Sequence, residues 1–345
     1  MENQVKSEGA SDGQAGQHVF RLVLFQTGRQ KDQFGNLNPF VFHRVQSILD
    51  RHLKTPPENT TIDVWLESPG GSATTAYKLF LEISHRCSKL RFIIPDYAKS
   101  AATLLALGGD EIFMAPAAEL GPLDAQIGHP DREGVTISAL DIANALGFLA
   151  GFAAEYTVAG GYDVLEWTHL PRVDVLREFS RFAAKLMEPM MSKLDPHLIH
   201  KAKNELELAK HYAVAIQKAR HVQPKHRIKE EDLADHLVKN YPAHEFLVNR
   251  VEASESLGLP ITNLETYDKC GEVKKLHRQF SEHTFINATA RSIIRPWTEP
   301  TEADLIKATD RHPKAVHNDD ETHGAIDGAR IETVSAENTD AEQKE

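Results

Sequence analysis

The chain has 345 residues, 41% of them hydrophobic, which is enough to bury one substantial α/β core and a smaller accessory region. Its 39 Lys and Arg residues against 50 Asp and Glu give a net charge of -11, which argues against nucleic acid as the main partner. The longest apolar candidate, 139–154, is interrupted by Asp141 and Asn144, so we expect no membrane span.

The polar N-terminal segment, residues 1–17, predicts a disordered tail, and without an apolar signal-peptide core it favours a cytoplasmic protein. The apolar run 19–25 predicts the first strand. Asn38 and Pro39 signal the start of a helix, because asparagine caps helix N-termini and proline suits the first helical position. The apolar stripe of that helix consists of Phe40, Val41, Val45, Ile48, Leu49 and Leu53.

A strand, a turn and a helix are predicted next. The β-branched and apolar run 61–66 predicts a buried strand, which ends at Ser68-Pro69-Gly70-Gly71. Apolar residues at helical spacing follow from 74 to 83, so the two glycines lie where a strand turns into a helix N-terminus. Such a turn presents backbone N–H groups, and glycine lets another backbone or a ligand come close.

The same pattern recurs directly afterwards. The runs 90–95 and 111–114 predict two more strands, and the small-residue run 100–107 between them predicts a helix. Ser100 therefore lies near a strand-to-helix junction, beside the N–H groups of the helix start. The alternation of strands and helices from 19 to 115 predicts a largely parallel sheet covered by helices.

The second half of the chain is predicted to be mainly helical. Residues 131–134 predict a polar surface loop, and Ser138 and Asp141 have the capping-box spacing that opens a helix. Gly160-Gly161 is expected to break that helix. Further helical segments are predicted at 173–190, from Pro196 onward and within 231–259.

The helix that starts at Pro196 has one continuous apolar stripe, which consists of Ile199, Ala202, Leu206, Ala209, Ala213 and Ile216. This stripe packs either against a neighbouring subunit or on the chain's own sheet, and the sequence leaves both open. From residue 298 onward the chain is acidic and shows no periodicity, which predicts a solvated tail.

Taken in order, the motifs of the first half resemble a known family. Strand–SPGG–helix, strand–KSAATLLALGGDEI–strand and the following ELGPLDAQIG are similar to the Clp protease/crotonase superfold. Within it, they resemble most the serine dehydrogenase proteinase family, relatives of signal peptide peptidase A. Tyr241-Pro242-Ala243-His244 and the run 252–259 extend the resemblance, which covers about residues 18–264. Each motif is weakly specific alone, whereas their order and spacing together are specific.

The resemblance implies an α/β fold, with a Clp protease/crotonase-like parallel β-sheet core, covering helices and a C-terminal helical extension. We expect the core at 18–130 and the helical extension, which is also the expected oligomerisation region, at 131–264. The segment 265–297 receives no assignment, and the tails 1–17 and 298–345 flank the folded part.

For function, the resemblance implies a serine peptidase that cleaves unfolded or extended peptides through an acyl-enzyme and assembles as a homo-oligomer. Ser100 would be the nucleophile, and the backbone N–H of Ala101 with that of Gly70 or Gly71 would form the oxyanion hole. The peptide would lie as an added strand near the two glycines. A simpler interpretation of Ser100 is that it only caps its helix.

The general base stays open on the sequence alone. A serine–lysine dyad, as in signal peptide peptidase relatives, is not matched, because no lysine lies between Ser100 and Lys185. A Clp-type histidine is not matched either, because Asp124-Ala125-Gln126 occupies its expected place. The candidates for the base are His129, Asp124 and Lys203, with Lys99 as a fourth that adjoins the nucleophile but should point away from it.

No metal site and no cofactor are predicted. The chain has 18 histidines but no HExxH motif, and His197, His200 and His211 match a metal-binding helix face only in part. The glycine pairs form neither a GxGxxG motif nor a P-loop, so nucleotide binding is not supported.

Two alternatives to a peptidase stay open. Because no general base is evident, the chain could be a catalytically silent Clp-like module that binds peptides or supports assembly. Crotonase-like acyl-CoA chemistry, which uses the same pair of N–H groups to hold an enolate, is the less favoured alternative. The SPGG turn and a serine at the helix start favour a peptidase instead.

Overall fold

The computed structural model describes residues 18–129, 132, 135–167, 169–221, 228–241, 243–287 and 289–298. The chain divides into two units, 1–298 and 299–345, and every described residue lies in the first unit. The tails predicted at 1–17 and beyond 298 lie outside the described residues, as does most of the loop predicted at 131–134.

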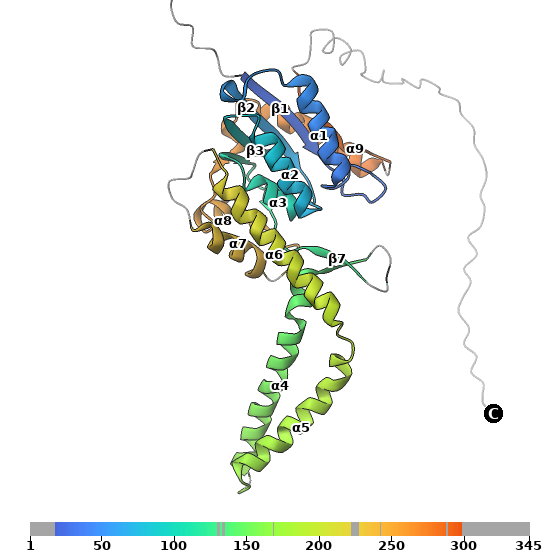
Figure 1. The fold of residues 1–345 in the computed structure, drawn as a ribbon, viewed down its shortest axis with the longest axis vertical. Coiled ribbons are helices and arrows are strands. Elements are labelled where there is room, and N and C mark those ends of the chain that lie inside the picture. Colours follow the sequence, from blue (N-terminus) through green and yellow to red (C-terminus); the bar gives the residue numbers. More distant parts are fainter. Residues whose placement is uncertain are drawn as a thin grey trace, which may run out of the picture. The chain divides into compact units, whose positions relative to one another are not determined.

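A six-stranded sheet forms the centre of the first unit (Figure 1). In spatial order its strands are β10 (Ile261–Asn263), β5 (Glu111–Met114), β3 (Lys89–Ile94), β2 (Thr60–Glu67), β1 (His18–Phe25) and β11 (Ile293–Pro296). Neighbouring strands are parallel except at the edge, where β11 pairs antiparallel with β1. The predicted parallel sheet is therefore confirmed, and β2 is buried along its whole length, as a central parallel strand should be.

Two smaller sheets lie outside the central sheet. One contains β4 (Tyr97–Ala98), β6 (Glu119–Leu120) and β9 (Val248–Asn249), and the other is a hairpin of β7 (Gln126–Gly128) and β8 (Thr136–Ser138). The sequence did not predict them, because strands of two or three residues are too short to show an alternating pattern.

Helices cover both faces of the central sheet. One face packs against a set of helices that consists of α1 (Pro39–His52), α2 (Ala73–Ser84), α3 (Ala101–Ala106), α6 (Pro196–Lys218), α7 (Glu230–Lys239) and α8 (Arg250–Glu255). The other face packs against α9 (Cys270–Ile286). Side chains alternate between the two faces along a strand, so Val64 joins the first core and Trp65 the second. Two 3-10 turns, η1 (Pro57–Asn59) and η2 (Leu264–Thr266), complete the described elements outside the long hairpin below.

The start of α1 agrees with its sequence signal. The Asn38 side chain accepts hydrogen bonds from the backbone N–H groups of Phe40 and Val41, and Pro39 is the first helical residue. The predicted stripe is buried at Val41, Val45, Ile48 and Leu49. The prediction is wrong for Phe40, whose side chain is 62% exposed because the first turn of the helix points it away from the sheet.

Two long helices, α4 (Ala139–Trp167) and α5 (Arg172–Met191), run side by side as a hairpin (Figure 1). The helix break predicted at Gly160-Gly161 is wrong, because α4 continues through both glycines. A Cβ atom at Gly160 would lie 2.5 Å from Cε1 of Phe179, so the missing side chain lets the two helices approach closely. This packing offsets the roughly 1 kcal/mol that a glycine costs inside a helix.

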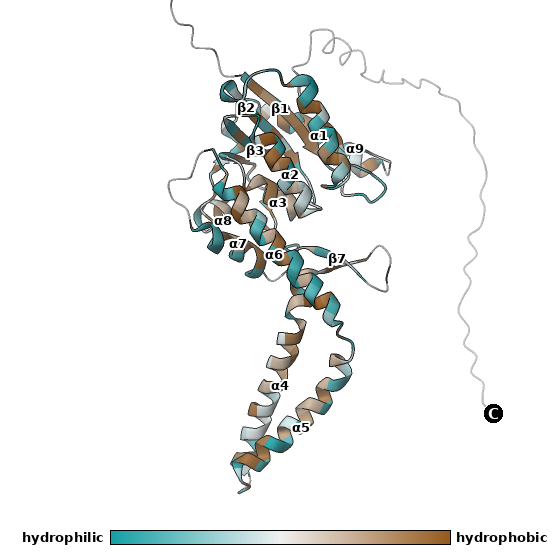
Figure 2. Ribbon diagram, viewed as in Figure 1, coloured by the Kyte–Doolittle hydropathy of each residue, from teal (hydrophilic) through white to brown (hydrophobic). Residues whose placement is uncertain are grey.

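The helix α4 is apolar over much of its length, as its brown colour in Figure 2 shows. Within the described residues it is the one helix whose length and composition would allow it to cross a membrane. Its most apolar window is not buried in the structure, and large exposed side chains on it include Leu146, Phe148, Tyr156 and Val158. The expected absence of a membrane span therefore stays a prediction.

A buried ion pair joins the centre of the sheet to the segment before α9. Asp63, fully buried on β2, accepts two hydrogen bonds from Arg91, from Nε at 2.6 Å and from Nη2 at 2.7 Å. The hydroxyl of Tyr267 donates to the same carboxylate at 2.6 Å. Burial, and then the charge of Asp63, raise the pKa of Tyr267, so the phenol keeps its proton at neutral pH.

Replacing Asp63 by asparagine should lower the free energy of unfolding by about 3–5 kcal/mol, because the Arg91 guanidinium would lose its buried counter-charge. The matched control is Asp50→Asn: Asp50 pairs with Arg86 at 2.7 Å, but its own side chain is 59% exposed. Exposed pairs contribute about 0–1 kcal/mol. Urea unfolding of both variants measures the difference, and equal losses would contradict this role of Asp63.

Candidate active site

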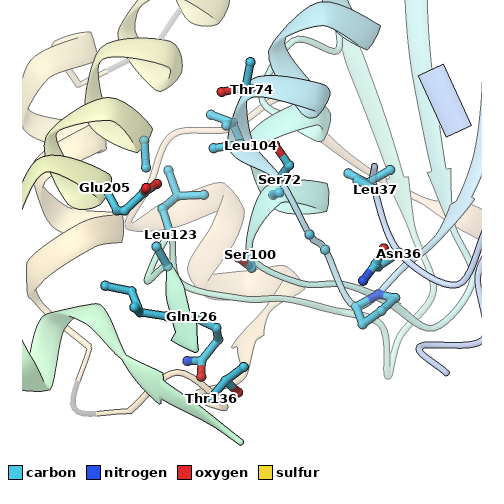
Figure 3. Close-up of a pocket in the computed structure, with 18 of the residues that line it drawn as sticks. Asn36, Leu37, Ser72, Thr74, Ser100, Leu104, Leu123, Gln126, Thr136 and Glu205 are labelled. Carbon is cyan, nitrogen blue, oxygen red and sulfur yellow. The ribbon is translucent and has the colours of Figure 1, made fainter. Parts of the chain in front are cut away.

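A cavity of about 640 Å³ lies where the turns after β2 and β3 meet α6 and the β7–β8 hairpin. Figure 3 shows Ser100 among its lining residues, with Leu123 and Glu205 on one side and Asn36 and Leu37 on the other. The remaining lining residues that matter for the chemistry are Gly70, Gly71, Ala101, Gln126, Lys201 and His244. The cavity thus contains the predicted nucleophile and every predicted oxyanion donor.

Ser100 has a backbone conformation that side chains rarely adopt. Its φ of 50° and ψ of -119° make it the one non-glycine residue with positive φ among the described residues. Such strain costs roughly 1–3 kcal/mol and is held in place only by the surrounding packing, here by α3, whose six residues are all buried. A strained turn between a strand and a helix is also how nucleophilic serines are presented in α/β-hydrolases.

The alternative that Ser100 only caps α3 does not account for this geometry. The side chain of Ser100 makes no capping hydrogen bond to the first turn of α3. By contrast, Ser72 accepts from the N–H of Thr75 at the start of α2, and Asn38 caps α1. Ser100 therefore carries the strain of the turn without the hydrogen bond that an N-cap gains.

The two glycines of the SPGG turn allow close approach by other segments, Gly70 by Ser100 and its neighbours and Gly71 by Leu37. A Cβ atom at Gly70 would lie 2.6 Å from the carbonyl oxygen of Lys99 and 2.9 Å from Cβ of Ser100. A Cβ atom at Gly71 would lie 2.4 Å from the carbonyl oxygen of Leu37. Both glycines also have positive φ, 101° and 139°, so the backbone conformation and the close approach require glycine at both positions.

The candidate oxyanion donors differ in how they are bonded. The N–H of Ala101 is the first of α3 and has no partner within that helix, and no acceptor for it or for the Gly71 N–H occurs among the described residues. The N–H of Gly70 donates to Oγ of Ser68 at 3.1 Å. Gly70 would have to exchange this bond to stabilise an oxyanion, whereas Gly71 would not.

A chain of buried polar groups fixes the position of Gly70. The Ser68 hydroxyl, which accepts from Gly70, donates to Oε1 of Gln26 at 2.6 Å. Nε2 of Gln26 in turn donates to the carbonyl oxygen of Phe34 at 2.6 Å. Because Ser68 and Gln26 are fully buried, these bonds are not exchanged with water, and they hold the SPGG turn against the loop before α1.

The base candidates from the sequence divide into those near the cavity and those away from it. His129 follows β7, where its N–H donates to the carbonyl of Val135 at 2.8 Å, and it does not line the cavity. Lys203 is exposed on α6 and does not line it either. Lys99 points away, because its ammonium group pairs with Glu119 at 2.5 Å. The site roles of these residues stay predictions, but their positions do not favour them.

Asp124 does not line the cavity itself, but it lies near His244, a lining histidine that was not among the predicted bases. His244 lines the cavity, and its Nδ1 lies 3.8 Å from Oδ2 of Asp124. Both of these atoms are buried and have no hydrogen-bond partner among the described residues, while Oδ1 of Asp124 accepts from the N–H of Leu140 at 3.0 Å. The available signal was His244 itself, in the YPAH motif.

The family match found by comparison with known proteins falls on the region around this cavity. Residues 40–140 match the family model described as ClpP-like SDH-type serine proteinase. Two uncharacterized proteins of Methanocaldococcus jannaschii, MJ1495 and MJ0137, are 40% and 36% identical over 79 residues, which is 23% of this chain in each case. The match covers 27% and 28% of these relatives, so the chain spans about a quarter of their length.

Two solved structures of the 1510-N membrane-bound stomatin-specific protease are also similar. The match to a serine-to-alanine mutant has 18% sequence identity and a TM-score of 0.28, and covers 48% of this chain and 70% of the mutant's chain. A lysine-to-alanine mutant in complex with a substrate peptide has 12% identity and a TM-score of 0.40, and covers 86% and 98%. These TM-scores are too low to support any argument about this chain.

Replacing Gly70 by alanine should destabilise the fold by at least about 1–3 kcal/mol, because the new side chain meets backbone atoms and the φ of 101° is strained for it. Gly271→Ala is the matched control. Gly271 lies in α9, where a Cβ atom would meet nothing within 4 Å, so alanine should be neutral or stabilising by up to about 1 kcal/mol. Thermal unfolding compares the two, and a neutral Gly70→Ala would show that the turns do not touch.

The segment that matches the family model begins in α1 and ends in the first turn of α4. It contains both turns of the cavity, with Gly70, Ser100 and Asp124, but it ends well before His244. The predicted resemblance is confirmed over this segment, because residues 40–140 match the family model described as ClpP-like SDH-type serine proteinase.

Proposed function

We propose that this chain is a serine peptidase that cleaves unfolded or extended peptides through an acyl-enzyme on Ser100. The observation that carries the proposal is the strained Ser100, pressed against a diglycine turn in a cavity that also contains His244. The family match of residues 40–140 supports a serine peptidase in general. A peptide substrate, a homo-oligomer and a cytoplasmic location remain parts of the proposal.

In the proposed mechanism, His244 is the general base. Its Nδ1 faces the Asp124 carboxylate, so Nε2 is the ring nitrogen left to take the proton of the Ser100 hydroxyl. The hydroxyl oxygen then attacks the peptide carbonyl carbon, and His244 passes the proton to the leaving amine as the C–N bond breaks. In the second half, His244 takes a proton from water, the water oxygen attacks the acyl carbon, and His244 returns the proton to Oγ of Ser100 as the ester bond breaks.

The developing oxyanion would be bound by main-chain donors. We assign the Ala101 N–H as one donor, because it starts α3 and lies beside the nucleophile. The second donor is Gly70 or Gly71, both of which line the cavity. One such donor contributes roughly 3–4 kcal/mol to lowering the barrier, so loss of the turn geometry would be felt strongly in kcat.

The peptide would be added to a strand edge, but not at Gly70-Gly71, where the sequence predicts it. The chain's own Leu37 already pairs there: its N–H donates to Gly70 O at 2.7 Å and its carbonyl accepts from Ser72 at 2.8 Å. The hairpin strand β7 pairs with β8 along one edge only and lines the cavity with all three of its residues. We therefore place the extended peptide along the other edge of β7.

A catalytically silent peptide-binding module is the second candidate. The 3.8 Å separation of Asp124 and His244 favours it, because this distance is longer than a hydrogen bond. In a working site the two groups would have to close by about 1 Å when a peptide binds, as catalytic hydrogen bonds often do.

Labelling with a fluorophosphonate probe separates these two candidates. The peptidase should form a covalent adduct on Ser100, located by mass spectrometry of the digested protein, and Ser100→Ala should abolish it. Ser192→Ala, which removes an exposed serine at the end of α5, should label like the wild-type chain. A folded wild-type protein that forms no adduct would favour the silent module.

Kinetics of a fluorogenic peptide distinguish the base candidates. His244→Ala and Asp124→Asn should each lower kcat by roughly 10³- to 10⁴-fold, because they remove the proton acceptor or its orientation. His129→Ala and Lys203→Ala, as histidine and lysine controls outside the cavity, should stay within about twofold of wild type. Circular dichroism checks the fold of each variant, and a loss confined to His129→Ala or Lys203→Ala would refute the assignment.

A further inference from the structure

A second cluster of ligand-type side chains lies on the α9 face of the sheet. Glu67 is the last residue of β2, Asp96 follows β3, and His277 comes from α9. Nε2 of His277 lies 3.1 Å from Oε2 of Glu67 and 3.8 Å from Oδ2 of Asp96, and one ligand atom from each residue lies within 4.8 Å of the others. Among the described residues this is the one such group of three.

The spacing of these atoms suits a small cation. Zinc binds imidazole nitrogen and carboxylate oxygen at about 2.0–2.2 Å, so two ligand atoms in a tetrahedral site are about 3.4 Å apart. The observed separations of 3.1 Å and 3.8 Å lie on either side of that value. Three ligands from three separate elements leave a fourth position open.

Glu67 gives a second, independent indication. Its side chain is 5% exposed, and Oε2, the atom that faces His277, is buried and has no hydrogen bond of acceptable geometry among the described residues. A buried carboxylate oxygen without a well-formed hydrogen bond needs a compensating positive charge.

The cluster is accessible from one side. The Asp96 side chain is 50% exposed, and a cavity of about 420 Å³ adjoins the cluster, lined by Glu67, Tyr97 and Ser281 among others. The donor set of one imidazole and two carboxylates suits zinc or manganese better than magnesium or calcium, which prefer oxygen ligands alone.

We propose that Glu67, Asp96 and His277 form a binding site for a divalent transition-metal cation, with zinc as the best fit. The cation would join the carboxyl ends of β2 and β3 to α9. These two strand ends lead directly into Ser68-Pro69-Gly70-Gly71 and into the turn that carries Ser100. The bound ion would therefore hold the two turns of the cavity together from the opposite face of the sheet. No local sequence motif indicates this site, because its ligands are far apart in the chain.

The competing arrangement is a simple ion pair, in which His277 carries a proton between the two carboxylates. The Ser281 hydroxyl lies 3.1 Å from the same Nε2 and would be a further partner of that imidazole. Both arrangements use the same contacts, so measuring the stability of the fold does not distinguish them. Measuring metal binding does.

Isothermal titration of the full chain with Zn²⁺, after dialysis against a chelator, tests the proposal. Wild type should bind one equivalent that His277→Gln, Glu67→Gln and Asp96→Asn each weaken at least tenfold, which is the least that loss of a ligand should cost. His283→Gln is the matched control, an exposed histidine on the same helix, and should bind like wild type. Ser100→Ala should also keep the site, which separates this proposal from the peptidase proposal.

Substitutions at the buried Glu67 or at His277 could unfold the chain. Because Asp96 is half-exposed, Asp96→Asn should fold normally and still bind zinc more weakly. Thermal unfolding gives a second readout: Zn²⁺ should raise the Tm of wild type and His283→Gln but not of His277→Gln. Equal zinc isotherms for wild type, His277→Gln and Asp96→Asn would overturn the site and leave the ion pair.

Discussion

The cavity depends on one steric constraint, the contact between the turn after β2 and the turn after β3. The two strands are parallel and adjacent, with Trp65 opposite Ile93, so both turns leave the sheet at the same end. They can meet only because Gly70 has no Cβ and because Ser100 accepts a φ of 50°. Buried bonds around Ser68 and the fully buried α3 hold this strained arrangement.

The opposite face of the sheet supports the same two strands. Asp63 on β2 and Arg91 on β3 form a buried ion pair that Tyr267 joins, and α9 packs over Trp65 and its neighbours. The proposed cation site would add a third link at the strand ends. Interactions on this face therefore hold together the same two strands that lead into the turns of Gly70 and Ser100.

Local signals predicted much of the fold and half of the site. Asn38-Pro39, the SPGG turn and the strand–helix alternation are each local patterns, so the sequence shows them directly. The position of Ser100 at a strand-to-helix junction could be predicted in the same way. His244 and Asp124 meet only through the fold, and no local pattern indicates that contact. The three-residue strand β10 is too short to recognise, and Gly160 was misjudged because Phe179 packs on it.

The most direct measurement is a crystal structure of the chain with a peptide boronic acid, which forms a tetrahedral adduct with a nucleophilic serine. The predicted result is a bond to Oγ of Ser100, with one boronate oxygen about 2.7–3.1 Å from the Ala101 N–H and from the N–H of Gly70 or Gly71. His244 should then lie within hydrogen-bond reach of the adduct. An adduct on another residue, or an oxygen that points away from both turns, would contradict the proposed active site.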